Sequence, residues 1–258
     1  MGLRHALLDG AMTATRGLGL TACPILMYHA LEDEESDLCV RPAAFREQMM
    51  WLRDNGFETI SLDECAARIT GASSRRGRSV VITFDDGYAD NLEHGVPVLR
   101  ELGFTATVFI ATGSVGGRAK WLDVPWPMMT WAQIAECDAS GITIGAHTVT
   151  HPHLGQIPME QARDEMARSK DEIEQHLGGR VTWMCYPFGD HTPEVESETE
   201  RLGFRGAVSV RQGNVNRAED LFRLRRFYIG PKTDLRHFAL ATSRLWTWKH
   251  GALGRLRS

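Results

Sequence analysis

The sequence lacks the features that would assign it to a specialised class of protein. It has no apolar run of transmembrane length, no internal repeat and no Cys-x-x-Cys pair. The net charge of −4 provides no general basic field, so we expect no nucleic acid partner. The cysteines are odd in number and scattered, which is typical of reduced cytosolic thiols rather than a disulfide framework: Cys23, Cys39, Cys65, Cys137 and Cys185.

The two ends of the chain differ from its middle. Segment 1–23 is interrupted by Arg4, Asp9 and Arg16, so it does not resemble a signal peptide, and we expect a cytoplasmic protein. Its leucines recur at helical spacing, which predicts a short amphipathic helix packed on the body, with contact to a membrane surface as the alternative. Tail 247–258 mixes basic and aromatic residues. We expect it to be solvated, and contact with anionic lipid is again the alternative.

Region 24–246 alternates buried strands with helical patterns, which predicts one α/β domain with parallel strands, either a barrel or an open sheet. Strands are expected at 24–29, 57–60, 80–84, 105–111, 142–146, 182–186, 206–210 and 224–229. Helices are expected to begin near Pro42, Ser61, Ala89, Thr130, Met159, Thr192 and Asp234, the last of them ending near Trp246.

Residues 80–88, Val-Val-Ile-Thr-Phe-Asp-Asp-Gly-Tyr, form the stretch around which the chain is organised. A buried strand runs directly into two carboxylates, and Gly87 allows the chain to turn away. Adjacent carboxylates resist ionising together, and a metal on one of them removes that cost and leaves the other as a base. Asp-Asp-Gly by itself favours an ordinary strand-ending turn.

Histidines follow two other strands. His147 and His151 have the His-x-x-x-His spacing of many zinc sites. Gly145 before them and Pro152 after them argue against a helix, so a loop must present both rings. His29 ends the first strand. Each of these histidines, taken singly, is also compatible with a structural role.

The polar groups share one location. In parallel barrels and sheets the active site lies at the carboxyl ends of the strands, and the Asp pair, the His pair, His29 and the Tyr-Pro-Phe-Gly turn at 186–189 all follow strands. One carboxylate and two imidazoles suit a catalytic divalent metal, which polarises a carbonyl and makes water more acidic. A second carboxylate and a further histidine then suggest hydrolysis of an amide.

Aromatic residues near these groups are candidates for substrate contact. Trp121 and Trp126 lie in the long loop 113–127, where they would either stack on a sugar ring or pack as a lid. Phe188 in the turn after the strand at 182–186 is a third candidate.

The motifs Thr-Phe-Asp-Asp-Gly at 83–87, His-Thr-x-x-His-Pro at 147–152 and Tyr-Pro-Phe-Gly at 186–189 together resemble the polysaccharide deacetylase family, also called NodB-homology or carbohydrate esterase 4. The resemblance covers roughly residues 24–210. It implies a distorted (β/α)7–8 barrel, similar to a TIM barrel, that removes acetyl groups from N-acetylated sugars with a divalent metal, zinc first, with cobalt, nickel or iron also acceptable.

The resemblance also implies roles for individual residues. Asp85 would be the general base, and the Tyr186 backbone N–H would help to stabilise the oxyanion. The metal ligands would be Asp86, His147 and His151. The opening strand, Pro-Ile-Leu-Met-Tyr-His, is similar to that of permuted members that act on poly-N-acetylglucosamine and related exopolysaccharides, so His29 is assigned as the general acid.

The sequence departs from the family pattern in its third motif. The family often places there an arginine that braces the base, and this chain has Cys185 at that position. Arg226 could replace the arginine through space, but we expect an ordinary ion pair for it. A downstream Asp-Trp motif is not evident, and His237 lies in a helical pattern that indicates a structural role.

The sequence leaves two alternatives to a sugar de-N-acetylase. The same metal site could hydrolyse a different, small amide, as in allantoinase-like relatives. The altered third motif could also mark a sugar-binding protein without catalytic activity. The substrate expected on the main interpretation is an N-acetylated glycan, an oligosaccharide or a lipid-linked N-acetylhexosamine.

Overall fold

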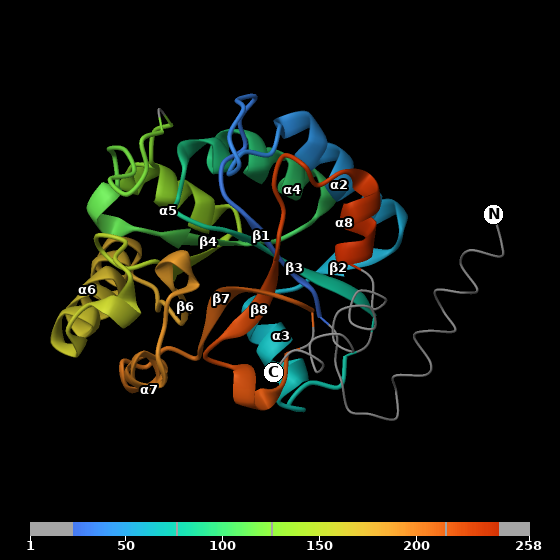
Figure 1. Ribbon diagram of the computed structural model, residues 1–258. Coiled ribbons are helices and arrows are strands. Elements are labelled where there is room, and N and C mark those ends of the chain that lie inside the picture. Colours follow the sequence, from blue (N-terminus) through green and yellow to red (C-terminus); the bar gives the residue numbers. More distant parts are fainter. Residues whose placement is uncertain (1–22, 76, 125, 215, 243–258) are drawn as a thin grey trace.

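Strands and helices alternate along the chain in the computed structural model, which describes residues 23–75, 77–124, 126–214 and 216–242 (Figure 1). The ladders between the strands are parallel. The strands are β1 (Ile25–Tyr28), β2 (Phe57–Thr59), β3 (Arg78–Phe84), β4 (Thr107–Ile110), β5 (Thr143–Ala146), β6 (Trp183–Cys185), β7 (Gly206–Gln212) and β8 (Leu224–Tyr228).

Seven of these strands close into a barrel. Neighbours pair in the order β1-β8-β7-β6-β5-β4-β3, and β1 then pairs with β3 to complete the ring. The β1–β3 register places Ile25 beside Val81 and Tyr28 beside Phe84. β2 lies outside the ring, paired with β3. The predicted distorted (β/α) barrel is therefore confirmed.

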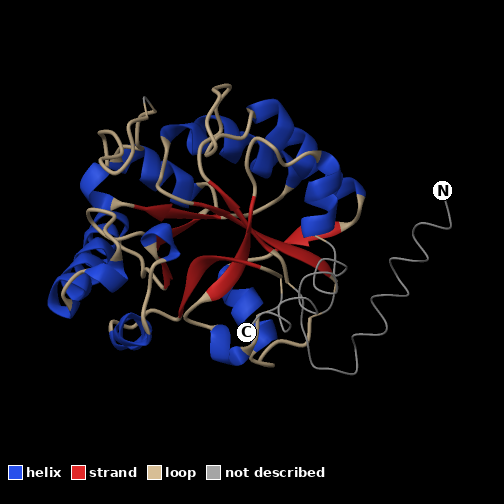
Figure 2. Ribbon diagram, viewed as in Figure 1, coloured by secondary structure: helices blue, strands red, loops and turns tan. Residues whose placement is uncertain are grey.

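Helices surround the barrel (Figure 2), and several begin at the side-chain caps that the sequence indicated. Ser61, Thr130, Thr192 and Asp234 each accept the backbone N–H three residues later. The α-helices are α2 (Pro42–Asp54), α3 (Leu62–Ile69), α4 (Val96–Leu102), α5 (Trp131–Ala139), α6 (Met159–Leu177), α7 (Pro193–Arg201) and α8 (Leu235–Ala241). A π-helix, η2 (Asn91–Gly95), precedes α4, and short 3₁₀ turns occupy Thr112–Ser114, Leu154–Gln156, Pro187–Gly189 and Ala218–Asp220.

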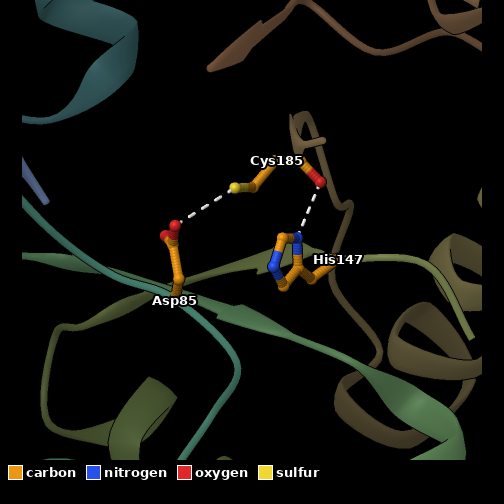
Figure 3. A group of neighbouring side chains, drawn as sticks. All are labelled: Asp85, His147 and Cys185. Carbon is orange, nitrogen blue, oxygen red and sulfur yellow. Dashed lines mark hydrogen bonds between the residues drawn. The ribbon is translucent and has the colours of Figure 1, made fainter. Parts of the chain in front are cut away.

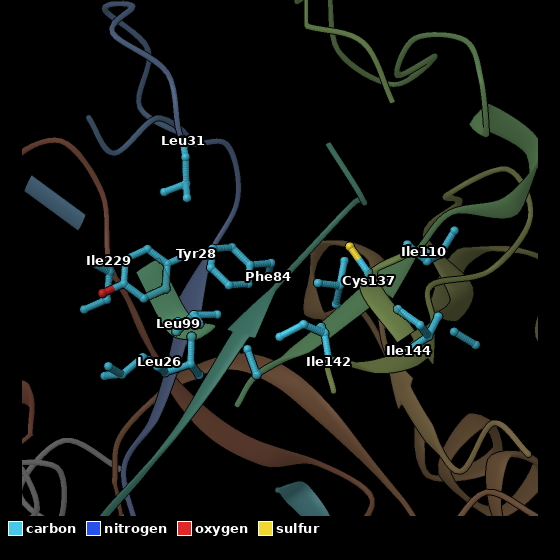
Figure 4. Close-up of a cluster of buried hydrophobic side chains, with 14 of the residues drawn as sticks. Leu26, Tyr28, Leu31, Phe84, Leu99, Ile110, Cys137, Ile142, Ile144 and Ile229 are labelled. Atoms are coloured by element: carbon cyan, nitrogen blue, oxygen red, sulfur yellow. The ribbon is translucent and has the colours of Figure 1, made fainter. Parts of the chain in front are cut away.

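Alternate residues of each barrel strand face opposite sides, which gives the protein two apolar layers. Ile25, Val81, Phe109 and Trp183 belong to the layer inside the barrel, which Leu62 and other residues of α3 close at the amino ends of the strands. The second layer lies between the barrel and the outer helices (Figure 4) and includes Leu26, Tyr28, Leu31, Phe84, Leu99, Ile110, Ile142 and Ile144. The remaining end of the barrel, at the carboxyl ends of the strands, is left for polar side chains.

Gly145 on β5 makes room for a large ring inside the barrel. A Cβ at this position would lie 2.4 Å from Cδ1 of Phe109 and 3.2 Å from the carbonyl oxygen of Trp183. A side chain here would therefore displace the packing directly beneath the histidine loop.

The predicted elements agree with the structure to within a few residues at most ends. The expected helix ending near Trp246 ends at Ala241 within the described residues. The expected amphipathic helix at 1–23 and the tail 247–258 lie outside the described residues, apart from Cys23. Among the residues that the structure describes, no helix is both long and apolar enough to cross a membrane.

Candidate active site

The two adjacent aspartates differ in backbone conformation. Asp85 continues the strand, because its N–H donates to the carbonyl of Tyr28 on β1 at 2.9 Å. Asp86 has a φ of 75°, in the left-handed region that a non-glycine residue occupies at a cost of about 1–3 kcal/mol. Gly87 follows at 89°, and a Cβ there would lie 2.8 Å from Cδ1 of Ile110. The turn therefore requires glycine, as the sequence indicated.

The two histidines lie in the loop that follows β5. Thr148 and His151 have φ values of 64° and 62°. Oγ1 of Thr148 accepts the His151 N–H at 3.1 Å. Glu165, a buried residue of α6, accepts two successive backbone N–H groups of the loop at 2.9 and 2.8 Å. These bonds hold the loop in a strained conformation, which is a frequent property of functional sites.

Three buried side chains converge here: Asp86, His147 and His151. Oδ1 of Asp86 lies 3.3 Å from Nε2 of His147 and 3.4 Å from Nε2 of His151, and the two Nε2 atoms are 3.1 Å apart. A tetrahedral zinc site with bonds of about 2.0–2.1 Å has ligand–ligand distances of about 3.3 Å, so this triangle fits such a metal. His147 Nδ1 lies 2.7 Å from the Cys185 carbonyl, to which it donates, so Nε2 is the ring nitrogen that faces the cluster.

Burial and charge oppose each other in this cluster. Burial raises the pKa of Asp86, but His147 and His151 outweigh burial and bring that pKa well below its usual value. Burial lowers the pKa of His151, and the net direction is down. Burial also lowers the pKa of His147, but Cys185 and Asp86 raise it and the net direction is up. Asp86 is therefore ionised, as a metal ligand must be.

Asp85 is held by an arginine from the other end of the chain. Arg226 on β8 donates from Nη1 to Oδ1 and from Nη2 to Oδ2 of Asp85, each at 2.7 Å, and both side chains are buried. Arg226 also donates to the Ser209 carbonyl and to Oγ1 of Thr83. The expectation of an ordinary ion pair for Arg226 is corrected, because its partner is the predicted base itself.

Cys185 leaves space for this guanidinium. Its Sγ lies 3.5 Å from Oδ2 of Asp85 and 3.2 Å from Nη2 of Arg226, and Figure 3 shows the thiol beside Asp85. Burial raises the pKa of the thiol, so it is neutral. Burial also raises the pKa of Asp85, but Arg226 outweighs burial and the net direction is down. Asp85 is therefore ionised across the neutral range.

His29 lies directly after β1 and is half-buried. Beside the larger effects of burial and of the partners named above, His29 contributes to lowering the pKa of both Asp85 and Asp86. Its Nδ1 is buried without a hydrogen-bond partner among the described residues. The Tyr228 ring lies edge-on to the His29 ring, with centroids 6.0 Å apart.

The aromatic candidates have different environments. Trp121 stacks on the His151 ring with centroids 4.0 Å apart, and Phe188 meets the same ring edge-on at 4.6 Å. Phe188 is 43% exposed and lies at the rim. Trp126 is 3% exposed, packs against Tyr88 and donates to a carboxylate of the loop after β1. Of the two uses predicted for the tryptophans, packing is therefore the one that Trp126 adopts.

Tyr186 is buried, and its hydroxyl donates to the Phe222 carbonyl at 2.9 Å. Its backbone N–H, the predicted oxyanion donor, donates at 3.3 Å to the Val208 carbonyl. That bond is long for an N–H group, and the oxyanion role of Tyr186 stays a prediction.

A family model described as polysaccharide deacetylase matches residues 72–207. This chain belongs to the polysaccharide deacetylase family. It is accordingly an enzyme that acts on N-acetylated carbohydrate. The Bacillus subtilis protein YxkH is 32% identical over 208 residues, which are 81% of this chain and 71% of that protein.

Other members of the deacetylase family agree in sequence and fold. The poly-beta-1,6-N-acetyl-D-glucosamine N-deacetylase of Escherichia coli K12 is 25% identical over 83% of this chain, and the match spans 37% of that larger protein. The Streptococcus pyogenes deacetylase PplD, solved with acetate, superimposes with a TM-score of 0.78 at 25% identity, covering 87% of this chain and 99% of that one. IcaB from Ammonifex degensii gives 0.76 at 26% identity, covering 86% and 97%.

Sequence reasoning missed several residues that shape this deacetylase site. Glu165, Asp90 and Asn91 hold the site loops through hydrogen bonds, and nothing in their local sequence patterns distinguishes them from residues that cap or end helices. Arg226 was recognised as a candidate but assigned a minor role, because sequence does not show which strands become neighbours when the barrel closes.

Proposed function

We propose that this chain is a metal-dependent de-N-acetylase of a glycan, an oligosaccharide or a lipid-linked N-acetylhexosamine. The observation that supports it best is that Asp85, braced by Arg226, lies beside the triangle of Asp86, His147 and His151. A braced base next to a three-ligand cluster is the arrangement that metal-assisted amide hydrolysis requires.

Asp86, His147 and His151 would hold the metal. Their donor atoms form a triangle of the right size, and one carboxylate with two imidazoles suits zinc, with cobalt, nickel and iron(II) as alternatives. When bound, the metal supplies a Lewis acid for the acetyl carbonyl and makes water more acidic.

The other residues of the site transfer the protons of the reaction. Asp85 accepts a proton from the attacking water as its oxygen adds to the acetyl carbon. His29 donates a proton to the sugar nitrogen as the carbon–nitrogen bond breaks, so acetate and a free amine leave. Arg226 keeps Asp85 ionised and oriented, which is the task that the family arginine performs from the third motif.

Phe188 and Trp121 would form the walls that receive the sugar. Trp121 stacks on the His151 ring and Phe188 meets that ring edge-on, and Phe188 exposes 43% of its surface at the rim. Aromatic rings present apolar faces on which sugar rings stack.

The Arg226–Asp85 pair also argues against a non-catalytic sugar-binding protein. That alternative rested on Cys185 in the place of the bracing arginine, and the brace is present from another strand.

The decisive experiment measures acetate release from N-acetylglucosamine oligomers by metal-stripped protein, with and without added zinc. We expect zinc-dependent release that Asp85→Asn abolishes, because an amide cannot accept the proton. Unchanged activity in Asp85→Asn would remove Asp85 as the base. Stoichiometric zinc binding without acetate release from any oligomer would refute the proposed substrate class.

A further inference from the structure

The predicted acid, His29, has little to orient its ring. Its Nδ1 has no hydrogen-bond partner in the part of the chain that the structure describes, and the Tyr228 ring contacts it only loosely, at 6.0 Å between centroids. A histidine that donates a proton needs a fixed position, since a displacement of about 1 Å can lower a rate about a hundredfold. Its position must therefore come from its backbone.

Two buried side chains hold that backbone. Nδ2 of Asn91 donates to the His29 carbonyl at 2.8 Å. Oδ1 of Asp90 accepts the Leu31 N–H at 2.9 Å. Asn91 also donates to Oδ1 of Asp90 at 2.7 Å, which ties the two anchors together. Asp90 is 3% exposed and Asn91 1% exposed, so water does not compete for these bonds.

The anchors come from the same segment as the base and a metal ligand. Asp90 and Asn91 follow Asp86 by four and five residues, and Asn91 begins the π-helix η2. π-Helical turns are rare and occur frequently at functional sites. The chain thus passes from the strand end that carries Asp85 and Asp86 directly to the residues that hold His29.

We propose that Asp90 and Asn91 are positioning residues that set the distance of His29 from the scissile amide. This inference rests on the proposed function, in which His29 protonates the leaving nitrogen. Their hydrogen bonds reach the His29 carbonyl and the Leu31 N–H, so the two residues act on His29 through the backbone that leads away from it.

Changing the leaving group of the substrate separates loss of the acid from damage to the rest of the active site. The amine of a sugar amide leaves only when it is protonated, whereas the phenolate of 4-nitrophenyl acetate leaves without a proton. A variant that misplaces the acid therefore loses activity on the amide and keeps it on the ester. Damage to Asp85 or to the metal cluster lowers both.

The experiment compares kcat on an N-acetylglucosamine oligomer and on 4-nitrophenyl acetate, using the zinc-loaded protein. We expect His29→Ala to lose about 100-fold on the amide and Asn91→Ala at least about tenfold, with less than about threefold lost on the ester. In the double variant that combines His29→Ala with Asn91→Ala, the loss of kcat on the amide should equal that of His29→Ala alone. Asp90→Ala should behave as Asn91→Ala, and Asp90→Asn, which keeps an acceptor for the Leu31 N–H, should restore the amide rate.

Controls separate the possible failures. Asn55→Ala removes an asparagine whose Nδ2 bonds a carbonyl at the end of α2, and it should change neither rate. Thermal unfolding and zinc content identify variants that do not fold, and the isosteric Asn91→Asp then replaces Asn91→Ala. Equal losses on amide and ester in Asn91→Ala, or additive losses in the double variant, would overturn the inference. Equal losses in His29→Ala would instead refute His29 as the acid.

Discussion

Replacing Arg226 by methionine leaves Asp85 buried without a counter-charge. The wild-type carboxylate accepts two hydrogen bonds from the guanidinium at 2.7 Å, and this pairing lowers its pKa despite complete burial. Methionine fills similar space but offers no donor. The pKa of Asp85 should therefore rise above its ordinary value, because only the effect of burial and the weaker contributions of the histidines remain.

The structure sets the size of the effect. An adjacent arginine lowers an aspartate pKa by about 1–3 units, and each unit corresponds to about 1.4 kcal/mol. Breaking a buried ion pair by removing one partner costs about 3–5 kcal/mol of stability. We therefore expect Arg226→Met to lose stability in this range at pH 7 and to shift the acid limb of kcat/KM upward by about 1–3 pH units.

The contribution of Asp85 to the pH dependence of stability should have the opposite sign in Arg226→Met. In the wild type the pKa of Asp85 is lower in the folded than in the unfolded chain, where it is about 3.9. The carboxylate therefore contributes stability above about pH 3.9, and this contribution is lost as the pH falls through the folded pKa. In the variant a raised pKa contributes stability below that value, which is lost as the pH rises.

The measurements are urea unfolding and kcat/KM between pH 4 and 9. Arg163→Met is the matched control, because Arg163 has 47% of its side chain exposed and its partner Glu198 keeps a second arginine, Arg201. Arg226→Lys, which keeps the charge without the two-pronged contact, should retain a low Asp85 pKa with reduced kcat. An unshifted acid limb in Arg226→Met would refute the assignment of Arg226 as the brace of the base.

Two further predictions concern Asp90 and Phe188. Burial raises the pKa of Asp90 to about 7, so the wild type should lose about 3 kcal/mol of stability relative to Asp90→Asn between pH 4 and 7, measured by urea unfolding. A stability difference that stays constant with pH would contradict this origin. Phe188→Ala should raise KM for N-acetylglucosamine oligomers up to about tenfold with kcat nearly unchanged, because it removes a stacking surface of about 1 kcal/mol. An unchanged KM in steady-state assays would remove Phe188 from the substrate site.

The local features of this protein were readable from its sequence. The buried strand before Asp85, the glycine after Asp86 and the spacing of His147 and His151 are short-range patterns, and each has a direct physical cause in strand burial, turn geometry or ligand spacing. The helix caps are also local, since a capping side chain bonds a backbone group three residues away. Such contacts join residues that are close in the chain, so the local sequence pattern is enough to predict them.

Contacts between distant strands were decided by the tertiary structure. Arg226 reaches Asp85 across 141 residues because β1 pairs with both β3 and β8, and the closure of the barrel makes them neighbours. Trp126 was one of two tryptophans with the same predicted uses, and only folding buried it. The sequence by itself determined which groups could perform the chemistry, and the closed barrel determined which arginine pairs with Asp85, because a buried charge takes the partner that folding brings within hydrogen-bond distance.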